Sequence, residues 1–125
     1  MNSLAWLFLS LIMALPATAL ADAAPPAAAT LFQQQFNALV ADDYDQFMAH
    51  ADADFAQALT PAEFSKLTDA LAGIFQPGDT TAYLGVLRQD GVRVHLWKVT
   101  PAAAQTDYLV KMAVRDDKLA GFWIQ

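Results

Sequence analysis

The dipeptide Asp90-Gly91 limits the fold of this chain more than any other feature of its sequence. It lies between two segments in which apolar and polar residues alternate, TAYLGVLRQ and VRVHLWKVT. Alternation with a period of two is typical of β-strands, and Asp-Gly between two such segments is a strong hairpin signal. A two-residue turn pairs Tyr83 with Lys98. The same register pairs Leu84 with Trp97.

A second hairpin is predicted around Asp116-Asp117, between the segments DYLVKMAVR and KLAGFWIQ. Asp-Asp specifies a turn less strongly than Asp-Gly, and a slip of one residue would exchange the two faces of the strands. With a two-residue turn, Trp123 points toward the helices, whereas Phe122 and Ile124 lie on the outer face. That face is too apolar to remain in water, so the pattern predicts that a second subunit covers it.

Helical patterns precede the strands. Apolar residues form one stripe over residues 30–40, and a second short helix is predicted to begin at Asp42 or Asp43. The segment TPAEFSKLTDALAGIF is the clearest helix, because Thr60 can cap its N-terminus and Pro61 suits its first turn. Helices followed by a four-stranded antiparallel meander predict an α+β fold with the helices packed on the sheet.

The N-terminal segment MNSLAWLFLSLIMALPATALAD has the layout of a secretory signal peptide. An apolar run of about 12 residues precedes Pro16 and the small residues that end at Ala21. A membrane span needs about 20 apolar residues, so cleavage after Ala21 is favoured over an uncleaved anchor. The prediction is a signal peptide over residues 1–21, a flexible lead-in over 22–29 and one domain over 30–125, located in the periplasm or secreted.

Composition narrows the classes of site and partner. The chain has no cysteine, which removes disulfides, thiol nucleophiles and thiolate metal sites from consideration. The net charge is −6, and the acids are concentrated before residue 80. An acidic first half argues against nucleic acid or an anionic membrane as the main partner, so neither is predicted once the signal peptide is removed.

The two strand segments, YLGVLRQDGVRVHLWKVT and YLVKMAVRDDKLAGFWIQ, resemble the strand half of the NTF2-like (cystatin-like) superfamily. The ending LAGFWI is most similar to small exported domains of the DUF3887 type. The resemblance implies a strongly bent sheet wrapped around the helices as a cone, with a ligand pocket at its mouth and a dimer interface on its outer face. Isomerases, dehydratases, cyclases, transport factors and association domains share that fold, and no catalytic motif of the enzymes matches this sequence residue by residue.

Residues on the predicted inner face are the pocket candidates, and residues on the outer face are the dimer candidates. The pocket candidates are Tyr44, Tyr83, Lys98, Tyr108, Met112 and Trp123. The dimer-face candidates are His95, Trp97, Phe122 and Ile124. The ligand hypothesis expects a cavity beneath Tyr83, Lys98 and Trp123. Lys98 is expected to form an ion pair at the pocket rim with Asp43 or Asp45, in preference to a catalytic role.

His95 has two interpretations. It is either a general base whose pKa is tuned by neighbouring arginines or a half-exposed side chain on the outer face, and the second is favoured because no acid on that face orients the ring. His50, Asp52 and Asp54 lie within five residues of one another, but the Gly turn and distal Glu of a hard-cation loop are missing. No metal site and no cofactor are predicted.

The predicted function is a non-enzymatic module that binds a small apolar or weakly acidic ligand or associates with a protein, as a homodimer. The chief alternative is a cofactor-free lyase or isomerase that uses pocket Tyr, Asp or His side chains as acid and base. A third is a pure dimerisation module. A titratable group inside the cavity distinguishes an enzyme from a binder, because a binder can have a wholly apolar cavity.

Overall fold

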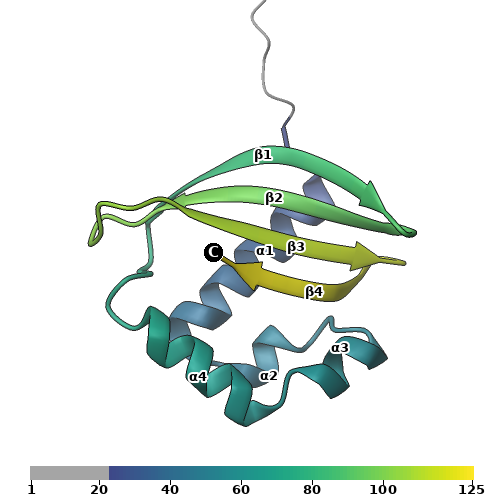
Figure 1. Ribbon diagram of the computed structural model, residues 1–125, viewed down its shortest axis with the longest axis horizontal. Coiled ribbons are helices and arrows are strands. Elements are labelled where there is room, and N and C mark those ends of the chain that lie inside the picture. Colours follow the sequence, from purple (N-terminus) through teal and green to yellow (C-terminus); the bar gives the residue numbers. More distant parts are fainter. Residues whose placement is uncertain (1–22) are drawn as a thin grey trace, which may run out of the picture.

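The computed structural model describes residues 23–125, so the predicted signal peptide lies outside the described residues. Helices precede a four-stranded antiparallel sheet in the order β1-β2-β3-β4, which confirms the α+β fold (Figure 1). The elements are α1 (Pro26–Ala41), α2 (Tyr44–Phe47), α3 (Ala53–Ala58), α4 (Pro61–Leu71), β1 (Thr80–Gln89), β2 (Val92–Thr100), β3 (Tyr108–Arg115) and β4 (Lys118–Ile124). Within residues 23–125, none of these helices has the length and apolar character of a membrane span.

Local capping signals explain where the helices begin. Helix α4 starts as predicted, because the Thr60 hydroxyl accepts a hydrogen bond of 3.2 Å from the backbone N–H of Glu63. Helix α1 starts at Pro26, before the predicted start at residue 30, so the second half of the expected lead-in is helical. Proline suits the first turn of a helix and alanine has the highest helix propensity, which explains the earlier start.

Both predicted hairpins are present, and their turns lie at the same end of the sheet (Figure 1). Asp90 and Gly91 have φ values of 52° and 77°, and Asp116 and Asp117 have φ values of 51° and 62°. Positive φ at both central residues is the geometry of the two-residue turns that match strand twist. Asp-Asp therefore forms the same class of turn as Asp-Gly here.

A bulge at Leu84 changes the register of the first hairpin beyond the turn. Gly85 pairs with Leu96 as the two-residue turn requires, but Tyr83 then pairs with Trp97 and not with Lys98. The predicted pairing of Tyr83 with Lys98 is therefore wrong. Gly85 has a φ of 135°, a conformation that L side chains rarely adopt, and it allows the extra residue to be inserted.

A second bulge, at Ala120, reverses the faces of β4. Val114 pairs with Leu119, but Ala113 pairs with Gly121, so one residue of β4 is left over. As a result Trp123 lies on the outer face and is 52% exposed, whereas Phe122 packs on the core. The prediction for these two residues is wrong, because it assumed an unbroken register from the turn to the strand end.

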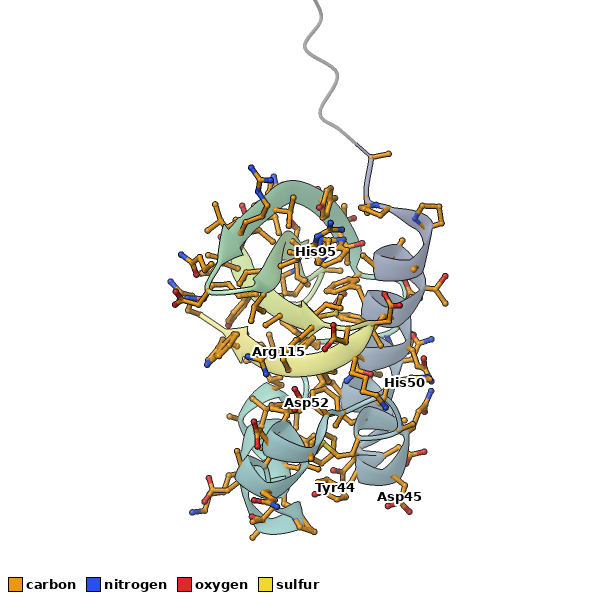
Figure 2. The ribbon with its side chains drawn as sticks, turned by 90° about the vertical axis from the view of Figure 1, so that its right-hand side faces the viewer. Tyr44, Asp45, His50, Asp52, His95 and Arg115 are labelled. Carbon is orange, nitrogen blue, oxygen red and sulfur yellow. The ribbon has the colours of Figure 1, made fainter. Side chains whose placement is uncertain are left out.

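The core lies between the concave face of the sheet and the helices. Phe32 of α1 stacks on Trp97 of β2 with ring centroids 4.1 Å apart. Phe47 of α2 contacts Phe122 of β4 edge to face, with centroids 5.2 Å apart. Figure 2 shows the sheet curving toward α1, in agreement with a bent sheet.

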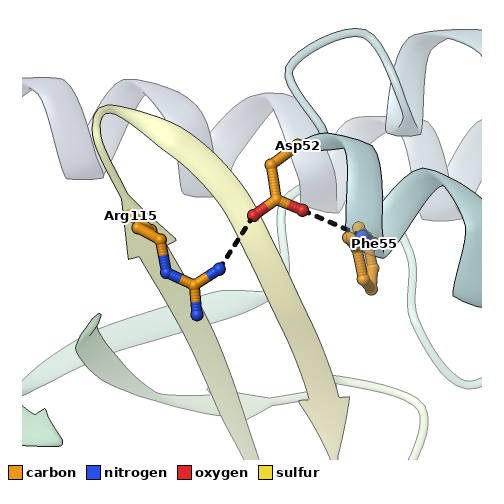
Figure 3. A network of polar contacts seen from close by, with 3 residues as sticks. All are labelled: Asp52, Phe55 and Arg115. Atoms are coloured by element: carbon orange, nitrogen blue, oxygen red, sulfur yellow. Dashed lines mark hydrogen bonds and ion pairs between the residues drawn. The ribbon is translucent and has the colours of Figure 1, made fainter. Parts of the chain in front are cut away.

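The segment between α2 and α3 attaches the helices to β4. The backbone N–H of Leu119 donates to the carbonyl of His50 at 2.7 Å, and the N–H of Asp52 donates to the carbonyl of Leu119 at 2.8 Å. The Asp52 carboxylate also caps α3 through the N–H of Phe55 and accepts a bond from Arg115 at 3.3 Å (Figure 3). This part of β4 therefore has backbone partners on both sides.

Candidate functional site

A large cavity lies at the end of the molecule that carries both hairpin turns. Its volume is about 790 Å³, and its walls come from the first turns of α1, from β2 and β3, and from the β3–β4 turn. The lining residues are Pro25, Pro26, Ala27, Ala28, Thr30, Leu31, Gln34, His50, Gly91, Arg93, His95, Val114, Asp116 and Asp117. The cavity is therefore not beneath Tyr83, Lys98 and Trp123, where the sequence-based hypothesis expected it.

His95 is the buried titratable residue of the cavity wall. It is 4% exposed and lies on the concave face of β2, between the sheet and α1 (Figure 2). Its Nδ1 is 2.9 Å from the hydroxyl of Tyr83, which holds the imidazole in place. The Leu84 bulge creates this contact, because it moves Tyr83 to the face that carries His95.

The second nitrogen of His95 is the one available to the cavity. Nε2 has no hydrogen-bond partner within residues 23–125. It is not one of the fully buried atoms without a partner there, so it retains some contact with solvent. Of the buried side-chain polar atoms in the described part of the chain, Gln35 Oε1 alone lacks a partner. We infer that His95 meets the cavity through Nε2.

The pKa of His95 is lowered from its ordinary value. The main cause is loss of hydration on burial, which disfavours the charged imidazolium, and the positive charge of Arg93 adds to it. His95 is therefore neutral near neutral pH, and a neutral imidazole can donate one hydrogen bond and accept one.

The remaining charged groups of the cavity come from its rim. Arg93 on β2 and the acids Asp116 and Asp117 are exposed, as is His50. In the described residues the ion pairs within 4.0 Å are Lys66 with Glu63 and Arg115 with Asp52, so neither joins charges of the cavity. Charges of opposite sign therefore line one cavity without forming an ion pair with one another.

None of the six predicted pocket residues lines this cavity. Tyr83 contributes indirectly through its hydrogen bond to His95. Tyr44 donates to the carbonyl of Leu59 at 2.6 Å. Tyr108 packs edge to face on Phe75, with centroids 5.4 Å apart.

The other three pocket candidates were assigned to the wrong surroundings. Met112 faces the helices as predicted but is completely buried in the core, where no ligand reaches it. Lys98 is exposed and pairs with Ala82, and among residues 23–125 it forms no ion pair with Asp43 or Asp45 within 4.0 Å. Trp123 lies on the outer face, where the Lys111 ammonium is 6.0 Å from its ring centroid.

The four predicted dimer-face residues point inward, so their assignment to the outer face is wrong. His95 and Trp97 are buried, and Phe122 and Ile124 pack against the core. Alternation along the paired strands places a different set on the outer face: Leu87, Val94, Leu96, Leu109, Lys111, Ala113 and Trp123. Leu87 and Trp123 are 46% and 52% exposed, so an apolar outer face exists but is made of other residues.

Two signals in the sequence could have located the cavity. A four-stranded meander brings its first and third turns to one end of the sheet, which places Gly91 close to Asp116 and Asp117. The start of α1 at Pro26 was also readable from its proline and alanines. The bulge that joins Tyr83 to His95 had a weaker signal, because an isolated glycine such as Gly85 suggests a bulge in a strand but is also compatible with an unbroken one.

A metal site at His50, Asp52 and Asp54 finds no support in the structure. Within residues 23–125 no group of three or more His, Cys, Asp or Glu side chains could hold a metal ion. Asp52 is engaged by the cap of α3 and by Arg115.

Comparisons with known proteins yield one weak structural likeness. No family model and no curated protein matches the sequence. Among solved structures, AclR, a proposed hydroxylase from Streptomyces galilaeus, superposes with a TM-score of 0.44 at 13% identity. The match covers 78% of this chain and 76% of that chain. A likeness at this level does not assign the chain to a family.

Proposed function

We propose that this protein is a non-enzymatic domain that binds a small, weakly acidic ligand in the cavity at the turn end of the sheet. The observation that carries the proposal is His95, a buried imidazole held by Tyr83 that lines a cavity of about 790 Å³ together with Arg93. An acidic group of the ligand accepts hydrogen bonds from these two side chains.

Size and lining both support ligand binding. Pockets for small molecules commonly measure about 300–1,000 Å³ and combine apolar walls with a few convergent polar groups. Here Ala28, Leu31 and Val114 supply apolar wall, while Arg93 and His95 converge from one strand. The start of α1 adds the partial positive charge of a helix N-terminus.

The proposal includes export and membership of the NTF2-like superfamily. Residues 1–21 act as a signal peptide that is cleaved after Ala21, and the domain works in the periplasm or outside the cell as an NTF2-like domain of the DUF3887 type. Cell fractionation and N-terminal sequencing of the native protein test this part. A protein that starts at Met1 and is recovered from the cytoplasm contradicts it.

Ligand binding is tested by NMR with a library of carboxylate fragments. Binding at the cavity shifts the amide signals of Ala28, Gly91 and Val114, and the variant Arg93→Gln weakens it by about tenfold, the loss of one charge-assisted hydrogen bond. Arg88→Gln is the matched control, since Arg88 pairs with Arg93 across β1 and β2 but does not line the cavity. Absence of any fragment that shifts these amides contradicts the proposal.

His95 also favours a second candidate, a cofactor-free lyase or isomerase. A neutral imidazole held by Tyr83 at Nδ1 can accept a proton at Nε2, and a general base within a cavity is what distinguishes an enzyme from a binder. The test follows exchange of the α-protons of a small ketone in D₂O by ¹H NMR. Exchange that is lost in His95→Gln and reduced in Tyr83→Phe supports catalysis, whereas equal exchange in all three proteins excludes it.

The outer face of the sheet favours self-association as a homodimer. Leu87 and Trp123 are exposed apolar side chains on that face. Leu87→Asp is expected to halve the solution mass measured by light scattering, because an unpaired carboxylate cannot be buried in an apolar interface. Val86→Asp is the control, since Val86 is 45% exposed but points to the opposite face of β1. An unchanged mass for Leu87→Asp contradicts a dimer through this face.

A further inference from the structure

We infer that the ligand of this cavity is a small zwitterion. Its acidic group faces Arg93 and His95, and its cationic group faces the Asp116-Asp117 turn. This inference rests on the proposed function, because it assigns a ligand class to the same cavity.

The charges of the cavity wall point to a ligand with both signs of charge. Besides its two histidines, the wall carries one cation, Arg93, and two anions, Asp116 and Asp117. A purely acidic ligand would be attracted by Arg93 but repelled by the carboxylates of Asp116 and Asp117. A ligand that also carries an ammonium group turns that repulsion into attraction.

The backbone places the two halves of the site close together. Arg93 pairs with Val114 across β2 and β3, and Asp116 follows Val114 by two residues. Asp116 and Asp117 belong to a two-residue turn, so their backbone positions are set by the flanking strand pairs. Arg93 and both acids line the same cavity, and in the described residues no ion pair within 4.0 Å joins them across it.

His95 supplies an independent observation of a site. It is 4% exposed, its Nδ1 is occupied by Tyr83, and the residue lines the cavity, so Nε2 is the ring nitrogen left for a ligand. A neutral imidazole that accepts at Nδ1 can donate a hydrogen bond from Nε2 to a carboxylate that enters the cavity. Leu31 and Val114 offer apolar wall for the body of the ligand.

The experiment compares three probes that share one apolar body. L-phenylalanine carries both charges, 3-phenylpropanoate carries the acid alone and 2-phenylethylamine carries the amine alone. NMR titration of the full domain is expected to give the amino acid an affinity at least about tenfold above either relative, which corresponds to about 1.4 kcal/mol. The double variant Asp116→Asn with Asp117→Asn is expected to remove this preference and leave binding of 3-phenylpropanoate unchanged or tighter.

Asp90→Asn is the matched control. Asp90 has the same charge and a similar φ, 52°, in the other hairpin turn, but it does not line the cavity. The preference for phenylalanine persists in this variant.

The outcomes separate this inference from the proposed function. Equal affinity for phenylalanine and 3-phenylpropanoate overturns the zwitterion while ligand binding stands. Failure of all three probes, with carboxylate fragments still shifting the cavity amides, also overturns the zwitterion alone. Absence of any fragment at the cavity overturns both.

Discussion

At the scale of single residues, His95 shows how burial changes the role of a side chain. The sequence pattern favoured a half-exposed histidine on the outer face, without a group to orient it. In the fold it is buried on the concave face and Tyr83 holds its ring. The positive charge of Arg93 would repel a protonated imidazole. Each of these contacts disfavours protonation or fixes the orientation of the imidazole.

The lowered pKa of His95 makes the protein less stable in acid. As the pH falls through about 6.5, His95 of the unfolded chain takes up a proton, whereas the folded protein resists until its lower pKa is reached. Between these two pKa values the unfolded state binds more protons than the folded state. The free energy of unfolding therefore decreases as the pH is lowered. Urea unfolding from pH 8 to pH 5 is expected to show this loss in the wild type and a flatter profile in His95→Gln.

His50→Gln provides the comparison for that measurement. His50 lines the same cavity but is exposed, so removing it is expected to leave the acid-side loss of stability in place. If His50→Gln flattens the profile as much as His95→Gln does, burial of His95 is not the cause.

At the scale of elements, two bulges decide which side chains meet. The turn signals correctly predicted both hairpins and the pairs next to each turn. Beyond Leu84 in β1 and Ala120 in β4, however, one inserted residue reverses the faces. Because side chains alternate along a strand, a single insertion exchanges inner and outer residues for the rest of that strand.

The Ala120 bulge predicts an inverted ranking for two neighbouring aromatic residues. Phe122→Ala is expected to lower the free energy of unfolding by about 3 kcal/mol, because Phe122 packs on Phe47 in the core. Trp123→Ala is expected to cost about 1 kcal/mol or less, since Trp123 is 52% exposed and contacts Lys111 at the surface. Urea denaturation of both variants checks the ranking, and a larger loss for Trp123→Ala would show that β4 keeps its unbroken register.

At the scale of the whole molecule, the helices and the sheet are joined twice. Aromatic packing of α1 and α2 on β2 and β4 forms the core, and the segment before α3 binds the edge of β4 through backbone hydrogen bonds. Asp52 adds side-chain bonds at this second junction, to the N-terminus of α3 and to Arg115 (Figure 3).

Variants of Asp52 separate its cap from its ion pair. Asp52→Ala is expected to cost about 1–2 kcal/mol, because it removes the cap of α3 as well as the partner of Arg115. Asp52→Asn keeps a capping oxygen, so it is expected to cost about 1 kcal/mol or less. Arg115→Gln is expected to cost a similar amount, because the Arg115 side chain is 45% exposed. Urea denaturation gives the three values. Equal losses for Asp52→Ala and Asp52→Asn would show that the charge of Asp52 dominates and that its cap contributes little.

Short-range chemistry in the sequence determined where the elements lie. Thr60 begins α4, the Asp-containing dipeptides form both turns, and the order of helices and strands follows from the change of period near residue 80. These features depend on residues close in the chain, so the sequence alone could predict them.

Tertiary structure decided which residues form the cavity and which face the solvent. Arg93, His95 and the Asp116-Asp117 turn meet the start of α1 only after the sheet curves around that helix, and Tyr83 reaches His95 only through a bulge. A bulge is retained when burial of the residues beyond it outweighs the lost pairing of one residue, as with Phe122 against Phe47. That balance depends on contacts between distant segments, so no local pattern of the sequence contains it.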